Sequence, residues 1–265
     1  YYVWGTNGYV PHDDTKQISY SECDDEDEMI ESFLVWWEHN YPHIITGWNC
    51  KFFDIPYLVN RINNLNKRPS RLSPVGFIND RSVVIAGREN QYYTLFGIST
   101  LDYIDLYKKF TYKIRESYRL DYIGSVELGL KKLEVGDVQG YDLYKTNYQK
   151  FIEYNIRDVE IVEKLEEKMK LLELVITLAY ESKINFEDVF SPVRTWDAII
   201  YNFLKRKKIV IPLPPKQDDR KDIIGAYVKE PQAGLHKWVV SFDLNSLYPH
   251  LIQQYNISPE TLYDG

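Results

Sequence analysis

Cysteine and long apolar runs are both scarce in this sequence. The 265 residues include only 2 cysteines, Cys23 and Cys50, which lie in unrelated contexts. Two such cysteines support neither a disulfide framework nor a Cys-based metal site. No stretch approaches the roughly 20 apolar residues that a membrane-spanning helix needs, and no signal-peptide layout opens the chain. We therefore expect a soluble protein in a reducing compartment, with no membrane partner.

The sequence also lacks the excess of basic residues that DNA-binding domains often carry. Its formal net charge is −7, so composition alone does not predict a nucleic-acid-binding protein. However, metal-dependent phosphoryl-transfer sites need clustered carboxylates, and an acidic average can hide a local basic groove. Charge leaves the function open. The chain begins with Tyr1 rather than Met, and we expect both of its ends to be cuts in a longer polypeptide.

Helices and strands alternate along the first part of the chain. Apolar residues at helical spacing predict a helix over Glu26–Asn40, and the acidic cluster Glu22–Glu28 at its front end suits the helix dipole without a metal. A short buried strand is expected over Ile44–Trp48. Asp54 then leads a second helix with Pro56 in its first turn, where helix starts favour proline. This order predicts an α/β organisation.

A β-hairpin is predicted over Arg81–Ile98. Two β-favouring runs, Ser82–Ala86 and Gln91–Phe96, flank a polar turn at Gly87–Asn90. We expect the tip to be polar and solvent-facing. A hairpin of this kind can be a plain surface connection between two strands or can carry a function at its tip.

A long amphipathic helix is predicted over Phe151–Leu178, and a proline-containing linker over Lys207–Asp222. On the helix, Tyr154 and Asp158 are four residues apart and therefore project from the same face. A carboxylate beside a phenol can bind a metal and hold a water. The spacing alone is not specific, because Tyr9 and Asp13 share it.

The segment Ser241–His250, SFDLNSLYPH, is the most informative part of the chain. An apolar, β-favouring run at Trp238–Val240 is expected to deliver the carboxylate of Asp243 at a strand end. Tyr248 precedes Pro249, which favours an extended backbone at the tyrosine. A carboxylate is a good ligand for a hard cation, and a planar aromatic side chain is a good wall for a ring-shaped substrate.

This segment resembles motif A of the family B DNA polymerases, D-x-x-S-L-Y-P. GWNCKFFDIPY, at Gly47–Tyr57, resembles the second exonuclease motif of that family, and YNIRD, at Tyr154–Asp158, resembles the third. GAY, at Gly225–Tyr227, resembles the segment that joins the exonuclease and polymerase modules. LFGISTLDYIDLYKKF, FSPVRTWDAII and YNISPETL are similar to the replicative family B polymerases of T-even-type bacteriophages in particular.

The resemblance implies a mixed α/β (α+β) fold, with a ribonuclease H-like 3′→5′ exonuclease domain followed by the start of a polymerase palm. It implies an exonuclease domain over residues 1–170, a segment of the polymerase N-terminal domain with a linker over 171–214, and the start of the palm with motif A over 215–265. The implied function is template-directed DNA synthesis with proofreading.

For the exonuclease site, the resemblance implies two Mg²⁺ ions, for which Mn²⁺ can substitute. Asp158 would ligate one ion, Asp54 would support the second, and Tyr154 would position the attacking water. The family's first exonuclease motif, Asp-x-Glu on a strand, is not visible upstream of Asp54. We expect that it precedes Tyr1, and that the isolated chain binds catalytic metal poorly and is inactive.

For the polymerase site, the resemblance implies that Asp243 is a catalytic metal ligand and that the Leu244 carbonyl adds to the metal site. The backbone amides of Ser246 and Leu247 would face the triphosphate, and Tyr248 would pack under the sugar and exclude a 2′-hydroxyl.

Gly225, Ala226 and Tyr227 would contact DNA. The implied partners are primer–template DNA, dNTPs, a sliding clamp and a single-stranded-DNA-binding protein, in the cytoplasm of a bacterial host. The alternatives are a stand-alone 3′→5′ exonuclease of the DEDDy type, a non-catalytic DNA-binding relative, and a structural domain whose motifs are accidental.

Overall fold

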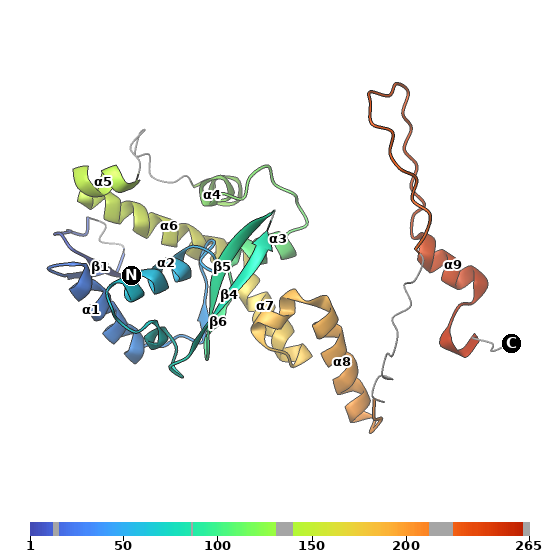
Figure 1. Cartoon of the computed structure of the whole chain (residues 1–265), viewed down its shortest axis with the longest axis horizontal. Coiled ribbons are helices and arrows are strands. Elements are labelled where there is room, and N and C mark those ends of the chain that lie inside the picture. Colours follow the sequence, from blue (N-terminus) through green and yellow to red (C-terminus); the bar gives the residue numbers. More distant parts are fainter. Residues whose placement is uncertain (13–15, 86, 131–139, 212–224, 262–265) are drawn as a thin grey trace. The chain divides into compact units, whose positions relative to one another are not determined.

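The computed structural model describes residues 1–12, 16–85, 87–130, 140–211 and 225–261. The chain divides into two compact units, Tyr1–Pro212 and Leu213–Gly265, and each is described by itself. Figure 1 shows the elements of both units. Whether the functional segments divide at residues 170 and 214 stays a prediction.

The first unit contains most of the regular structure. In chain order its elements are β1 (Tyr2–Gly5), β2 (Ser19–Glu22), α1 (Glu26–His39), β3 (Ile44–Ile45), α2 (Asp54–Asn64), η1 (Pro69–Leu72), β4 (Ile78–Ile85), β5 (Arg88–Leu95), β6 (Ser99–Thr100), α3 (Tyr103–Phe110), α4 (Leu120–Leu128), α5 (Gly140–Thr146), α6 (Tyr148–Met169), α7 (Leu171–Ser182), η2 (Phe186–Phe190) and α8 (Pro192–Arg206). The second unit contains α9 (Leu247–Tyr255) and η3 (Pro259–Thr261).

The strands of the described residues form three two-stranded sheets. β1 pairs with β2 and β3 pairs with β6, both in parallel, whereas β4 and β5 form an antiparallel hairpin. Parallel neighbours need a crossover connection, and α2 and the hairpin lie in the crossover between β3 and β6. The predicted mixed α/β class is confirmed.

The first two predicted helices are confirmed. α1 begins after Asp25, whose side chain caps the helix by accepting the Glu28 N–H at 2.9 Å. The acidic residues at its front also form ion pairs, Glu26 with Arg61 and Asp27 with Lys67. The acidic cluster is therefore explained by helix capping and ion pairing.

The strand predicted over Ile44–Trp48 is shorter and less buried than expected, since β3 is only Ile44–Ile45 and both residues are half-buried. Its parallel hydrogen-bonding pattern nevertheless continues. The Gly47 carbonyl accepts the Tyr103 N–H at 2.9 Å. The chain therefore enters the turn before α2 in a fixed direction.

The helix predicted over Phe151–Leu178 is two helices, α6 and α7. Lys170, between them, has φ 57° and ψ 36° in the left-handed region. The apolar spacing runs across this break, which is why it predicted one helix. The side chain of Glu166 accepts the Leu172 N–H at 3.1 Å and so takes up an amide that the break leaves without its helical acceptor.

The predicted hairpin is confirmed, but the turn predicted at Gly87–Asn90 is wrong. Ile85 pairs with Arg88, so two positions join the strands and Arg88–Asn90 belong to β5. Gly87 has φ +76°, which suits a tight hairpin turn. The strand end beside the turn is also not polar as predicted, since it exposes the apolar side chains of Val83, Val84 and Ile85 to solvent.

The strand predicted at Trp238–Val240 is absent from the described residues 225–261. An isolated extended run gains no ladder hydrogen bonds, and no strand of this range is available to pair with it. The extended backbone predicted for Tyr248 is also wrong, since Tyr248 lies in the first turn of α9. Pro249 is tolerated there because first-turn amides have no helical acceptor.

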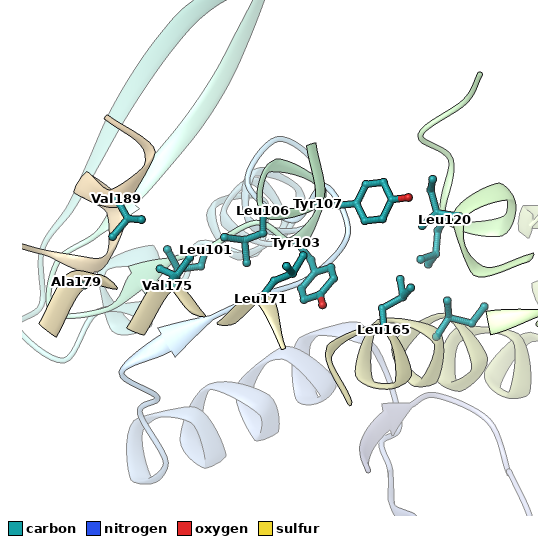
Figure 2. Close-up of a cluster of buried hydrophobic side chains, with 12 residues drawn as sticks. Leu101, Tyr103, Leu106, Tyr107, Leu120, Leu165, Leu171, Val175, Ala179 and Val189 are labelled. Atoms are coloured by element: carbon teal, nitrogen blue, oxygen red, sulfur yellow. The ribbon is translucent and has the colours of Figure 1, made fainter. Parts of the chain in front are cut away.

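Three apolar clusters support the described part of the first unit, and two of them are large. One packs α3, α4, α6, α7 and η2 together, and in Figure 2 the rings of Tyr103 and Tyr107 point from α3 toward Leu165 on α6 and Leu120 on α4. The other joins α1, α2, η1 and β5 around the fully buried Leu34.

The predicted linker begins inside the described chain, just after α8 ends at Arg206, and most of it lies outside the described residues. None of the helices in the described part of the chain has the length and apolar character of a membrane span.

Candidate functional site

A large open pocket of about 2390 Å³ lies in the first unit. Asp54, Tyr154 and Asp158 all line it, although Asp54 begins α2 and the other two belong to α6, far apart in the sequence. The structure therefore brings the three residues of the second and third exonuclease-like motifs together. Further acidic residues of the lining were not predicted from the sequence; they are Asp121, Glu163, Glu166 and Glu167.

Asp54 reaches this pocket as the first residue of α2. The turn before it is tight: a Cβ on Gly47 would lie 2.9 Å from the Cβ of Cys50, so glycine is needed for the close approach. Asn49 has φ 70°, and its carbonyl accepts the Phe53 N–H at 3.0 Å. These contacts turn the chain from β3 into α2 and fix the start of the helix.

The electrostatic environment of Asp54 favours a positive partner. The pKa of its carboxyl is raised above the ordinary value, chiefly because the surrounding protein removes water from it. The negative charges of Asp102 and Asp158 raise it further, while a hydrogen bond from the backbone N–H of Asp54 acts against them. A cation beside Asp54 would relieve this repulsion.

Tyr154 and Asp158 are carried by α6, one turn apart and both half-buried. Ile152 and Ile156 hold the opposite face of the helix in a cluster with Tyr9, and Leu165, two turns after Asp158, packs into the large cluster around Tyr103. Packing therefore fixes which face of α6 lines the pocket. A phenol and a carboxylate on that face can hold a water and a cation.

Aromatic and basic side chains surround the turn that carries Asp54. Phe53 and Tyr57 are exposed and stacked, with ring centroids 6.2 Å apart and an interplanar angle of 15°. Lys51 Nζ lies 4.7 Å from the ring centroid of Tyr92 on β5. Exposed aromatic faces with a nearby ammonium suit stacked, negatively charged single strands.

The metal set of this site is incomplete in the described chain. Among the described residues, no group of three or more His, Cys, Asp or Glu side chains could hold a metal ion. Asp54 and Asp158 are nevertheless hard oxygen donors of the kind that Mg²⁺ prefers, and Asp102 and Asp158 place further negative charge near Asp54. The residues present therefore fit part of a divalent-cation site.

The predicted polymerase residues all belong to the second unit. Asp243 and Leu244 precede α9, Leu247 and Tyr248 begin it, and Ser246 is the residue before it, with φ 54°. Gly225, Ala226 and Tyr227 precede them in a segment without regular structure. All of these residues are exposed within this unit.

Sequence reasoning missed one buried acid beside the first site, Asp102. It is 2% exposed and caps α3, accepting the Ile104 N–H at 3.1 Å. An aspartate directly before a helical pattern is a capping signal that the sequence does contain. Its contacts with the turn before α2 have no counterpart in any local sequence pattern.

Comparison with known families gives two matches. Residues 6–123 match the family described as DNA polymerase family B, exonuclease domain, and residues 195–265 match the family described as DNA polymerase family B. The first match contains Asp54, and the second contains Asp243. A mixed α/β first unit is consistent with the ribonuclease H-like fold of such an exonuclease domain.

Individual relatives are similar over nearly the whole chain. The DNA-directed DNA polymerase of Escherichia phage RB69 is 44% identical over 260 residues, and that of Enterobacteria phage T4 is 37% identical over 255 residues. Each match covers 96% of this chain and 28% of the relative. DNA polymerase 1 of Sulfurisphaera ohwakuensis is 32% identical over 239 residues, which cover 84% of this chain and 26% of the relative.

Proposed function

The chain belongs to the DNA polymerase family B, and on that premise we propose that it forms part of a replicative DNA-directed DNA polymerase with 3′→5′ proofreading activity. The first unit would contribute to the exonuclease site and the second to the polymerase site. The observation that carries this proposal is the meeting of Asp54, Tyr154 and Asp158 in one pocket. The match of residues 195–265 to the polymerase family favours this function over a stand-alone exonuclease.

In the exonuclease reaction, Asp54 and Asp158 would hold divalent cations, with Mg²⁺ as the expected ion and Mn²⁺ as a substitute. Such a pair of ions, when bound, polarises the scissile phosphate and stabilises the leaving oxygen. The Tyr154 hydroxyl would hydrogen-bond the attacking water and orient it. The exposed ring pair Phe53–Tyr57 would stack against the frayed primer end.

In the polymerase reaction, Asp243 would hold the cations at the incoming nucleotide, with the Leu244 carbonyl as a further ligand. The amides of Ser246 and Leu247 lie at the start of α9, where helix N-termini favour phosphate. Tyr248, in the first turn of the same helix, would lie against the sugar. Gly225, Ala226 and Tyr227 would contact the DNA backbone.

The proposed substrates are primer–template DNA and dNTPs, within a bacterial host cell. A sliding clamp and a single-stranded-DNA-binding protein are proposed as partners from the family resemblance. The hairpin of β4 and β5 is proposed to insert between template and primer. Its exposed Val84 and Ile85 suit contact with unstacked bases.

The two activities can be separated in the full-length polymerase that contains this chain. Asp54→Ala and Asp158→Ala should each lower exonuclease activity by on the order of 10²-fold or more, the usual scale for a preorganised electrostatic group. Primer extension should be nearly unchanged, because it uses Asp243. Asp243→Ala should give the opposite pattern.

Asp142→Ala, at an exposed position on α5, is the control for loss of one acidic charge. Degradation of a mismatched primer at the parental rate by either exonuclease variant would refute the assignment of that residue.

A further inference from the structure

The turn that carries Asp54 into the pocket has no side-chain cap of its own. Phe53, the residue before α2, makes no side-chain hydrogen bond to the helix. Inside the turn, the backbone is closed by hydrogen bonds from Phe53 N–H to Asn49 O and from Ile55 N–H to Cys50 O, each 3.0 Å long. The position of Asp54 therefore depends on whatever fixes residues 49–51.

Asp102 supplies that fixation from another element. One carboxylate oxygen, Oδ1, accepts the Asn49 N–H at 2.9 Å and the Ile104 N–H at 3.1 Å, and Oδ2 accepts the Lys51 N–H at 2.9 Å. Three backbone donors thus converge on one carboxylate that is 2% exposed. Hydrogen bonds to an ionised acceptor are roughly twice as strong as neutral ones, so this contact is a firm one.

Two further contacts hold the same turn, but neither involves the Asn49 and Lys51 amides that bind Asp102. The Trp48 Nε1–H donates to the Tyr118 carbonyl at 3.0 Å, and Lys51 Nζ lies over the Tyr92 ring. Both act through side chains. Asp102 is the acceptor that reaches the backbone on each side of Cys50.

We propose that Asp102 is a positioning residue of the exonuclease site, which holds the Asn49–Lys51 backbone and thereby sets where Asp54 stands at the start of α2. This inference rests on the proposed exonuclease function for its effect on activity. Asp102 does not line the pocket, so it acts through the turn rather than on the substrate. It also caps α3, and so joins the site to the core of the first unit.

Two substitutions separate this role from simple charge loss. Asp102→Asn keeps an oxygen that can accept the Asn49 and Ile104 amides, but it turns an NH₂ group toward the Lys51 N–H. Asp102→Ala removes all three acceptors. Asp105→Asn, in the first turn of the same helix, removes one charge without touching the turn and is the matched control.

The experiment uses the full-length polymerase that contains this chain. Hydrogen exchange of the peptide over residues 47–53 reports the turn directly, and single-turnover digestion of single-stranded DNA reports the chemistry. We expect exchange to rise and the cleavage rate to fall by about tenfold for Asp102→Asn and by about 10²-fold for Asp102→Ala, within the range for misplaced catalytic groups. The affinity for DNA and the rate of primer extension should stay within about twofold of the parental values for both variants, because neither depends on the position of Asp54.

Unchanged exchange over residues 47–53 in Asp102→Asn would overturn the proposal, as would equal losses of primer extension and cleavage. Faster exchange with a parental cleavage rate would also overturn it, because the turn would then not set the position of Asp54. Failure of the proposed function gives a different result: Asp54→Ala would keep its exonuclease activity, and the exchange over residues 47–53 would still report the contact with Asp102.

Discussion

The Glu160 carboxylate on α6 lies 3.0 Å from Nζ of Lys16, which precedes it by 144 residues. Arg157 and Lys164, on the same helix, approach the same carboxylate to 2.8 and 2.6 Å. Glu160 is 5% exposed. Burial alone would raise its pKa, but hydrogen bonds from the three cations outweigh it and hold the pKa at about 2.

Glu160→Gln is therefore expected to destabilise the first unit at neutral pH by about 2 kcal/mol, because it leaves three cations facing a neutral group. Because the pKa of Glu160 is lower in the folded chain than its ordinary value of 4.5, the ionised carboxylate stabilises the fold fully at pH values above 4.5. This stabilisation is lost as the pH falls toward 2. The difference in the free energy of unfolding between the parent and Glu160→Gln should shrink over the same pH interval. Urea unfolding at several pH values measures it.

Glu167→Gln, at an exposed position on α6, is the control and should change stability by less than about 0.5 kcal/mol. A Glu160 variant whose deficit stayed constant from pH 7 to pH 2 would show that the ion network does not stabilise the fold.

Lys170→Gly is expected to stabilise the chain. Lys170 has φ 57°, a region that costs a non-glycine residue about 1 kcal/mol, and part of the gain is offset by the greater freedom of glycine when unfolded. A rise of about 0.5–1 kcal/mol in the free energy of unfolding should result. Lys170→Ala separates loss of the side chain from relief of the backbone, and it should give no such rise.

Shortening the hairpin is expected to impair proofreading of duplex primers selectively. Removing Val84–Ile85 together with Arg88–Glu89 deletes two register pairs and keeps a two-residue connection between Val83 and Asn90. Digestion of paired primers should slow by about tenfold, or about 1.4 kcal/mol in the barrier, while digestion of single strands should not change.

The control keeps the hairpin length and replaces Val84 and Ile85 with threonine, which tests whether the apolar side chains or the reach of the hairpin matters. Equal slowing on single-stranded and duplex substrates would contradict the proposed insertion.

Tyr248→Ala in the full-length polymerase is expected to raise ribonucleotide incorporation by about tenfold or more, with a much smaller loss on deoxynucleotides. The proposed role of the ring is rejection of the 2′-hydroxyl rather than binding of the correct sugar. Asp243→Ala should abolish use of both sugars. Single-nucleotide additions with matched dNTP and rNTP measure the ratio, and parental discrimination in the Tyr248 variant would exclude the steric role.

Local patterns predicted what local interactions determine. The first helix was predicted from its apolar spacing and the acidic residues at its front end, and the second from Pro56 in its first turn. The break at Lys170 was not, because the apolar spacing on both sides of it is continuous and an unfavourable backbone conformation leaves no compositional mark. The strand before Asp243 failed because a strand needs a partner that its own residues do not specify.

For the site, the sequence provided the residues but not their surroundings. Asp54, Tyr154 and Asp158 were identified through their motifs, and the structure brings them to one pocket. Their proposed roles stay predictions. Asp102 was missed because its bonds to Asn49 and Lys51 span more than fifty positions of the chain, where neither periodicity nor spacing carries a signal.

The same separation orders the events of folding. The amides of Asn49 and Lys51 bind an acceptor that lies 53 and 51 residues later in the chain. β3 pairs with β6, which is similarly distant in the sequence. During synthesis at about 5–20 residues per second, α1 and α2 therefore emerge several seconds before the turn between β3 and α2 can close on Asp102. A ribosome-bound chain that has not yet exposed α3 would lack the acceptor for the Asn49 and Lys51 amides. The start of α2, and with it Asp54 of the proposed exonuclease site, would therefore reach its final position late.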